Sequence, residues 1–210
     1  MNRLFFQKPF KYKFFNATLY IIGINVIVFI ITNMYPRANL YLALNPSFMI
    51  QYSFYWQPLT YMFVHGSGMH LFCNMITLLC FGITLEKTIG SREFLLFYFV
   101  TGILTGVLSF VYYSLTGQYR VFLMGASGAI YAVLLAFSVV YPQSRIFVWG
   151  LIPVPAPLLV LVYAVIEIFC ALTGTRAGTA HLAHLFGLLL GVLYFIIRMK
   201  INPFKRWKNC

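Results

Sequence analysis

The residues best suited to chemistry in this sequence are polar side chains that interrupt apolar segments. Ser127 and His184 each lie in such a segment. A serine hydroxyl becomes a nucleophile when a base removes its proton, and an imidazole with an ordinary pKa of about 6.5 can do so at neutral pH. Because polar groups inside a membrane are costly, they are functional candidates by default. The two residues therefore form a candidate nucleophile–base pair for acyl transfer.

Candidate donors for the oxyanion of a tetrahedral intermediate also occur in the sequence. His70 and Asn74 are four residues apart, so on a helix they share a face and can donate toward one point. The backbone N–H groups of Ala126 and Ser127, near the start of a helix, are further candidates. Simpler interpretations exist, because a serine in a membrane helix can bond to its own backbone and a histidine can serve packing alone.

The remaining titratable residues leave other arrangements open. The chain has no Asp, and Glu167 is the only Glu in the middle of an apolar segment, so a conventional triad is not expected unless Glu167 turns inward. His181 is a second possible base. A different class of protein, a metal-dependent membrane hydrolase or metal transporter, could use four imidazoles as zinc ligands, although no HExxH motif accompanies them; these are His65, His70, His181 and His184.

The elements that must position these residues are membrane-spanning helices. The sequence is 61% hydrophobic and 9% charged, whereas soluble domains carry about 25% charged residues. Its apolar runs approach the ~20 residues that cross a bilayer; they cover residues 17–35, 70–85, 94–113, 127–141, 157–172 and 180–197. We therefore predict an all-α polytopic membrane protein, a six-helix bundle forming one domain over residues 1–210.

The charged residues predict the orientation of this bundle. With both termini in the cytoplasm, twelve of the fifteen Lys and Arg residues lie inside and only Arg37, Arg120 and Arg176 outside. Cytoplasmic loops carry such an excess of positive charge. The net charge of +12 therefore reflects topology and not a nucleic-acid-binding face. Glu86 and Glu93 are expected to cap helices or to pair with Lys87 and Arg92 at the membrane surface.

The predicted helices also indicate the depth of the polar residues. Ser127 and His184 are each fourteen residues from the cytoplasmic ends of their segments, at Tyr141 and Arg198, which is about 21 Å at 1.5 Å per residue. His70 and Asn74 bracket the same level, about 10 Å below the outer surface. Small residues at Gly128, Ala132 and Ala136, and at Gly187 and Gly191, predict either close helix approach or ordinary packing.

Four motifs in this order resemble the rhomboid intramembrane serine proteases. They are HGSGMHLFCN at 65–74, EKTIGS at 86–91, GASG at 125–128 with Tyr131, and AHLFG at 183–187 with Gly191. The resemblance implies Ser127 as nucleophile, His184 as general base and then acid, His70 and Asn74 as oxyanion donors, and Tyr131 beside the histidine ring. It favours His184 over His181, because only His184 has Gly three and seven residues later. Trp56-Gln57 departs from the Trp-Arg usual in the family.

The same resemblance implies the partners and the location. Substrates are expected to be transmembrane protein segments within the lipid bilayer, cut near the outer face through an acyl-enzyme, without a cofactor or metal. Gly125, Gly128 and Gly187 belong to the motifs that support the site. A rhomboid-like pseudoprotease that binds membrane clients without cutting them is an alternative. The small size resembles bacterial forms, which places the protein in the cytoplasmic (inner) membrane.

Overall fold

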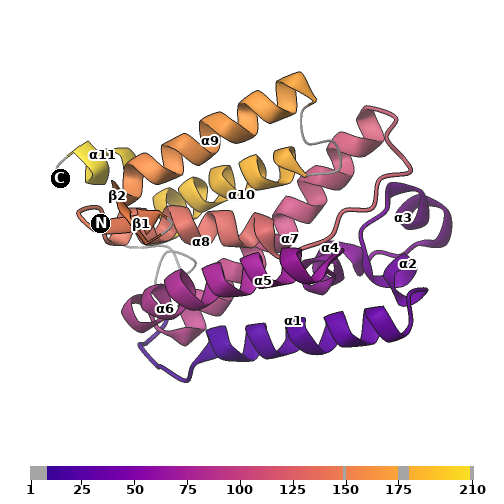
Figure 1. The fold of residues 1–210 in the computed structure, drawn as a ribbon, viewed down its shortest axis with the longest axis horizontal. Helices are drawn as coiled ribbons and strands as arrows, with labels where there is room; N and C mark the ends of the chain where they lie inside the picture. Colours follow the sequence, from indigo (N-terminus) through magenta and orange to yellow (C-terminus); the bar gives the residue numbers. More distant parts are fainter. Residues whose placement is uncertain (1–8, 149, 175–179, 209–210) are drawn as a thin grey trace.

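A computed structural model describes residues 9–148, 150–174 and 180–208 of the chain. Eleven α-helices and one antiparallel hairpin occur in this part (Figure 1). The helices are α1 Ala17–Met34, α2 Ala38–Leu42, α3 Pro46–Tyr52, α4 Gln57–Thr60, α5 Gly68–Thr77, α6 Ile83–Ile89, α7 Ser91–Leu115, α8 Ser127–Val140, α9 Ala156–Thr173, α10 His181–Tyr194 and α11 Pro203–Lys208. The strands are β1 Arg145–Val148 and β2 Ile152–Pro155.

Long apolar helices dominate this architecture, as predicted. Five helices of the described chain are long and apolar enough to span a membrane: Ala17–Met34, Gly68–Ile89, Ser91–Leu115, Ala156–Thr173 and His181–Met199. Two of these continue through π-helical turns, at Leu78–Gly82 and at Phe195–Met199. The sixth apolar helix, α8, is shorter. The fold is therefore the predicted helical membrane bundle, and the protein is a multi-pass integral membrane protein.

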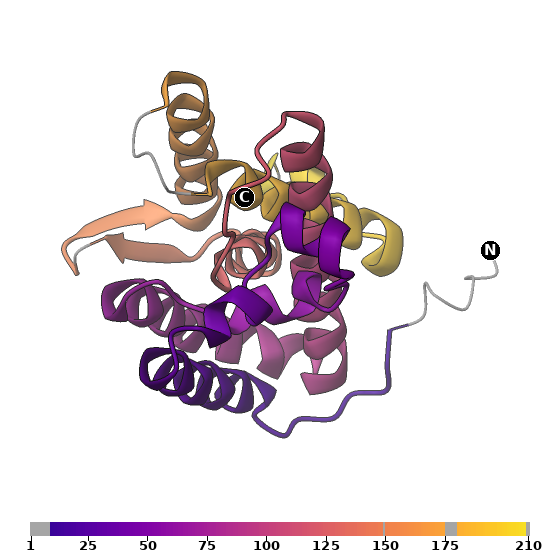
Figure 2. The same cartoon turned by 90° about the vertical axis from the view of Figure 1, so that its right-hand side faces the viewer.

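Helix α8 lies at the centre of the bundle. Figure 2 shows it nearly end-on, surrounded by the other helices. Most of its residues from Gly128 to Val139 are buried, whereas the outer helices expose apolar side chains such as Ile27 and Val165. Such outward apolar faces suit lipid, and a fully enclosed helix can be short because neighbouring protein covers its ends. The first residue of α8 is Ser127, so the packing of this helix positions the candidate nucleophile.

The small-residue stripes of α8 and α10 face each other. A Cβ atom built on Gly187 would overlap the carbonyl group of Gly128, and one built on Gly191 would lie 3.3 Å from the Cα of Ala132. Helix α8 makes its most extensive contacts with α10. Of the two interpretations of these stripes, close helix approach is therefore correct. Small residues allow two backbones to approach closely where there is no hydrophobic force between helices.

The long connection between the first two spans is structured by backbone-directed hydrogen bonds. Gln57, which stands where the family usually has arginine, is fully buried. Its Oε1 accepts from the backbone N–H of Asn45 at 3.0 Å, and its Nε2 donates to the carbonyls of Leu40 and Tyr41. The indole of Trp56 also donates to the Tyr41 carbonyl, at 2.9 Å. A neutral, buried amide thus joins separate parts of this loop through its backbone.

The segment that precedes Ser127 is held against this loop. Leu44 and Leu123 exchange two backbone hydrogen bonds, of 3.0 and 2.9 Å. The N–H of Gly125 donates to the Tyr61 carbonyl at 2.9 Å. These bonds satisfy backbone groups that lie outside any helix, as irregular backbone within a membrane protein requires. They also fix the point at which α8 begins.

The expected surface roles of Glu86 and Glu93 are wrong in part, since both carboxylates are buried. Glu86 does cap a helix, but a distant one: it accepts hydrogen bonds from the N–H groups of Ala17 and Thr18 at the start of α1. Glu93 pairs with Arg198, with Nε and Oε1 2.7 Å apart, and not with Arg92. Sequence proximity misled the prediction because buried charges take partners brought together by the fold.

Three of the basic residues used to predict orientation, Arg3, Lys8 and Arg176, lie outside the described residues. Of the others, Lys87 and Arg92 lie on either side of the junction between α6 and α7, and Arg145 begins β1, which follows the C-terminal end of α8. In Figure 1, the start of α1 and helix α11 lie at the same end of the bundle. The cytoplasmic location of both termini stays a prediction.

Candidate active site

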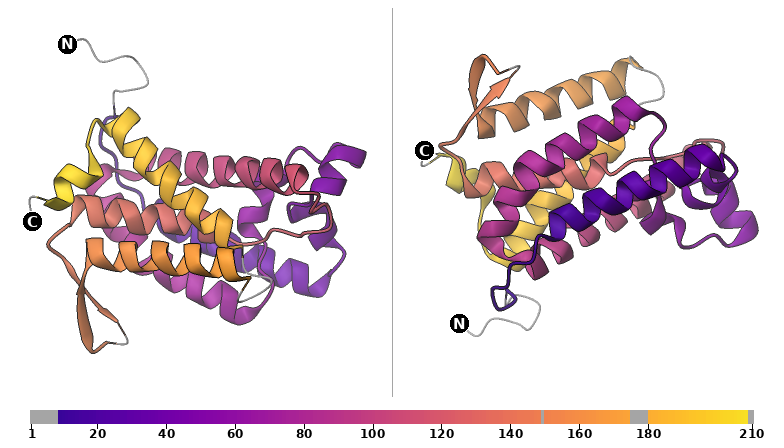
Figure 3. Two further views of the ribbon diagram at one scale, coloured as in Figure 1. Left: turned by 90° about the horizontal axis from the view of Figure 1, so that it is seen from above. Right: turned by 60° about the horizontal axis from the view of Figure 1, so that its bottom comes forward.

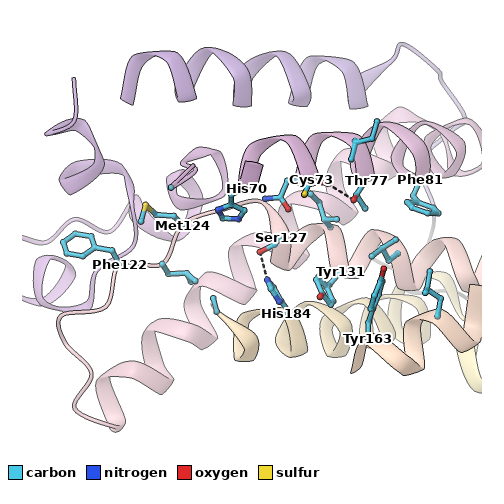
Figure 4. Close-up of a pocket in the computed structure, with 18 of the residues that line it drawn as sticks. His70, Cys73, Thr77, Phe81, Phe122, Met124, Ser127, Tyr131, Tyr163 and His184 are labelled. Atoms are coloured by element: carbon cyan, nitrogen blue, oxygen red, sulfur yellow. Dashed lines mark hydrogen bonds between the residues drawn. The ribbon is translucent and has the colours of Figure 1, made fainter. Parts of the chain in front are cut away.

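Ser127 and His184 come together although 57 residues separate them. The Nε2 atom of His184 lies 2.8 Å from the hydroxyl oxygen of Ser127, which is within hydrogen-bond distance (Figure 4). Ser127 opens α8, and His184 lies in the first turn of α10. The antiparallel packing of these two helices, made close by Gly128 and Gly187, brings the side chains to one level. The depth calculated from the sequence agrees with this contact.

The imidazole of His184 is held by an aromatic ring. Tyr131, one turn after Ser127 on α8, stacks on it with ring centroids 4.3 Å apart and planes 6° from parallel. Residues four apart on a helix lie on the same face, so Ser127 and Tyr131 contact the same ring. The stack restricts rotation of the imidazole. The resemblance implied this position for Tyr131, and the structure places it there.

His70 and Asn74 line the same cavity as Ser127 and His184. Figure 4 shows His70 on the opposite side of Ser127 from His184. The first N–H groups of α8 lack acceptors within the helix, so they are available near Ser127. The arrangement therefore gathers a candidate nucleophile, a candidate base and several candidate donors around one space. Such a set fits acyl transfer through a tetrahedral intermediate.

Gly125 fits closely beside His70. Its φ of 116° is strained for any residue with a side chain. A Cβ atom at this position would lie only 2.7 Å from Nε2 of His70. Glycine therefore serves two purposes here: it allows the turn before Ala126 and Ser127, and it leaves room for the His70 ring at the cavity wall.

The cavity is large and mostly apolar away from its polar end. It has a volume of about 1100 Å³. Besides the polar residues, its walls come from α5, the π-helical turn that follows it, α8, α9 and β1, and they include Ile76, Phe81, Leu134, Ile146, Phe147 and Leu159. Figure 3 shows β1 and β2 projecting from the bundle beyond the end of α8. The cavity thus extends from Ser127 along α8 toward the hairpin, which suits an elongated apolar ligand.

A carboxylate contacts the ring nitrogen of His184 that does not face Ser127. The sequence had left open whether any carboxylate would reach this ring. Glu167, on α9, turns inward and is buried. Its Oε1 lies 3.0 Å from Nδ1 of His184 and accepts a hydrogen bond from the hydroxyl of Tyr131. Its Oε2 lies 2.6 Å from Nδ1 of His181. A triad was not expected unless Glu167 turned inward, and in the structure its side chain does turn inward to contact His184. His181, the second possible base, contacts Glu167, whereas the hydrogen bond of Ser127 is to His184.

His65 is a site residue whose position the sequence analysis missed. Its Nε2 lies 3.0 Å from Nδ2 of Asn74, and its Nδ1 lies 3.3 Å from the Phe63 carbonyl. A neutral ring that donates from Nδ1 accepts from the Asn74 amide at Nε2, which leaves the second amide hydrogen of Asn74 free. His65 thereby orients a candidate oxyanion donor. The sequence offered for His65 only its place in the first motif and a possible role as a zinc ligand, and not this contact with Asn74.

The protonation of His65 predicts a pH dependence of stability. Burial, together with the nearby His70, lowers the pKa of His65 to about 4, whereas an unfolded histidine titrates near 6.5. Between these values the unfolded chain binds the proton and the folded chain does not, so this contribution to stability is complete above about pH 6.5 and is lost as the pH falls toward 4.

We expect the thermal midpoint of unfolding in detergent micelles to fall between about pH 7 and pH 4.5. The fall should be smaller in His65→Gln, which cannot take up this proton. Midpoints measured at matched pH values for both proteins test this expectation. Equal falls in the two proteins would contradict it.

The histidines divide into two groups with different partners. His65 and His70 contact each other with ring centroids 5.0 Å apart, whereas His181 and His184 share Glu167. Within the described residues, no three His, Cys, Asp or Glu side chains form a group that could hold a metal ion. The geometry therefore offers no observation that favours the metal-dependent alternative.

Comparison with known proteins identifies a family. The model of the Rhomboid domain matches residues 53–201, which include every residue of the site described above. The chain is 30% identical over 184 residues to the mitochondrial Rhomboid protein 1 of Saccharomyces cerevisiae, covering 85% of this chain and 52% of that protein. It is 28% identical over 163 residues to the Rhomboid protease GlpG of Haemophilus influenzae, covering 78% of this chain and 80% of that protein.

A third relative is the Rhomboid-related protein 4 of Mus musculus, 31% identical over 137 residues, which cover 62% of this chain and 42% of that protein. The chain thus spans about half the length of the yeast relative and most of the length of the bacterial one. The family match covers well over half of the 210 residues and contains both Ser127 and His184. This protein belongs to the Rhomboid family.

Proposed function

We propose that this protein is an intramembrane serine endopeptidase that cleaves transmembrane segments of other membrane proteins. The observation that carries the proposal is the 2.8 Å contact between Nε2 of His184 and Oγ of Ser127 at the polar end of the cavity. Membership of the Rhomboid family supports protease activity in general. The division of roles among this chain's residues is our inference from the geometry.

In the proposed reaction, the hydroxyl oxygen of Ser127 attacks the carbonyl carbon of a substrate peptide bond. His184 removes the hydroxyl proton and then gives it to the leaving amine, which departs as the C–N bond breaks. Water then attacks the resulting ester while His184 takes its proton, and His184 returns that proton to the Ser127 oxygen as the acyl C–O bond breaks. The products are two peptide segments, and the enzyme regains its starting protonation state.

The negative charge of each tetrahedral intermediate requires donors at its oxygen. The side chains of His70 and Asn74 and the N–H groups of Ala126 and Ser127 are the candidates, since they lie around Ser127 at the start of α8. His65 keeps the Asn74 amide in one orientation. Donors that are fixed in advance stabilise developing charge without reorganisation, and this is often the largest single contribution to catalysis.

The cavity supports a transmembrane segment as the substrate. Its apolar walls between α5 and α9 suit the apolar side chains of a segment that comes from the lipid bilayer, whereas its polar end suits an exposed peptide bond. A helix hides its carbonyl groups in internal hydrogen bonds, so the segment must unwind locally before Ser127 can attack. We infer from the positive-inside charge pattern that this end faces the outer side of the membrane. We place the protein in a bacterial cytoplasmic membrane, although its relatives include mitochondrial proteins.

A reactive-serine probe tests the proposal directly. Purified protein in detergent micelles is treated with a fluorophosphonate, digested and analysed by mass spectrometry. We expect the label on Ser127, and we expect its loss in His184→Ala and in heat-unfolded protein, because an isolated serine is a weak nucleophile. A folded protein that takes no label would contradict the proposal and favour a client-binding pseudoprotease.

A further inference from the structure

The buried carboxylate behind His184 is the feature that the family resemblance does not explain. Glu167 is only 6% exposed, and it comes from α9, whereas Ser127 and His184 come from α8 and α10. A charge at this depth is costly unless it has partners. We propose that Glu167 is a positioning residue that completes a Ser127–His184–Glu167 triad, an inference that rests on the proposed function.

The first argument concerns the tautomer of His184. In a neutral imidazole, one ring nitrogen carries the proton and the other has a lone pair. A carboxylate can only accept, so Glu167, at 3.0 Å from Nδ1, requires the proton to be on Nδ1. The lone pair is then on Nε2, which faces the hydroxyl of Ser127 at 2.8 Å. Glu167 therefore selects the tautomer that can act as a base.

The second argument concerns the charge of the transition state. When His184 accepts the proton from Ser127, its ring becomes positive inside a bundle of low polarity. Among the described residues, the polar groups near this ring are Ser127 and Tyr131 of α8, His70 of α5, Glu167 of α9 and His181, which shares Glu167 with His184. Glu167 is the only one of these that carries negative charge. It therefore stabilises the imidazolium, as the carboxylate of a serine-protease triad does.

The third argument concerns how the carboxylate is held. His181 donates to Oε2 at 2.6 Å, and the hydroxyl of Tyr131 donates to Oε1. Nε2 of His181 is buried and has no hydrogen-bond partner within the described part of the chain. The two donors, one on each oxygen, hold the carboxylate of Glu167 in place behind His184.

Kinetics of a conservative variant test the triad. Glu167→Gln keeps the shape of the side chain and removes its charge. We expect kcat for a transmembrane substrate in liposomes to fall by about 10²-fold or more, with KM changed by less than about threefold, because the loss is confined to the transition state. The matched control is Glu93→Gln. It alters another buried carboxylate, which contacts Tyr194 and Arg198 at the end of α10 farther from His184. We expect this variant to keep kcat within about threefold of the unaltered protein.

A spectroscopic measurement on the unaltered protein keeps the inference testable if Glu167→Gln does not fold. The chain has four histidines, so ¹⁵N-histidine NMR in micelles can report each tautomer, with His181→Gln and His65→Gln as assignment variants. We expect His184 to carry its proton on Nδ1 at neutral pH. Finding the proton on Nε2 would overturn the triad.

The outcomes separate this inference from the proposed function. If folded Glu167→Gln retains kcat within about threefold of the unaltered protein while Ser127→Ala is inactive, the triad is wrong and a two-residue mechanism stands. If Ser127→Ala remains active, the proposed function itself fails. A fall in kcat equal to that of Glu93→Gln, accompanied by an equal loss of thermal stability, would also overturn a role specific to His184.

Discussion

Substitution of Ser127 by alanine is expected to lower kcat/KM for a transmembrane substrate by at least about 10³-fold, and His184→Ala by a similar factor. The first change removes the atom that forms the acyl-enzyme in the proposed reaction. The second removes the base that the hydroxyl contacts at 2.8 Å. Because the two residues act in one step, the double variant should be no worse than either single variant.

Cleavage of a reporter protein in liposomes, followed by gel analysis and mass spectrometry of the products, measures these losses. Ser138→Ala is the matched control, because Ser138 is a buried serine on the same helix whose hydroxyl bonds to the carbonyl of Leu135. We expect this variant to retain activity. Losses that add up in the double variant would indicate that Ser127 and His184 act independently.

Gly187→Ala is the second change for which we expect a large effect. Alanine normally stabilises a helix relative to glycine by about 1 kcal/mol. Here the new methyl group would lie 2.8 Å from the carbonyl carbon of Gly128 and would overlap its oxygen, so α10 must move away from α8. Overpacking of this kind costs about 1–3 kcal/mol. A shift of about 1 Å at the base can reduce the rate by about 10²-fold.

Two glycines provide graded controls for this experiment. Gly191→Ala, one turn further along α10, would place its methyl 3.2 Å from Leu135 and 3.3 Å from Ala132, so we expect a small effect. Gly23→Ala on α1 meets nothing within 4 Å and should be neutral or stabilising. Thermal midpoints and kcat/KM are measured for all three variants. Equal activity in Gly187→Ala and Gly23→Ala would show that the close approach of α8 and α10 is not required.

The sequence determined the membrane helices and most of the site. Apolar runs predicted the six helices because helices satisfy their own backbone hydrogen bonds in lipid, and their bounds differ from the observed ones by only a few residues. The constant rise of a helix then placed Ser127 and His184 at one depth. Both inferences depend only on the residues of one segment and on the regular geometry of a helix, and not on contacts between segments.

Only the tertiary structure decided which polar groups meet across helices. The rotation of α9 about its axis turns Glu167 toward His184, and spacing along one helix cannot reveal this rotation. The buried amide of Gln57, the contact of His65 with Asn74 and the pairing of Glu93 with Arg198 likewise join distant segments. Buried polar groups take whatever partners the packing brings within about 3 Å. The candidate nucleophile and base were therefore evident in the sequence, whereas the carboxylate behind them required the assembled bundle.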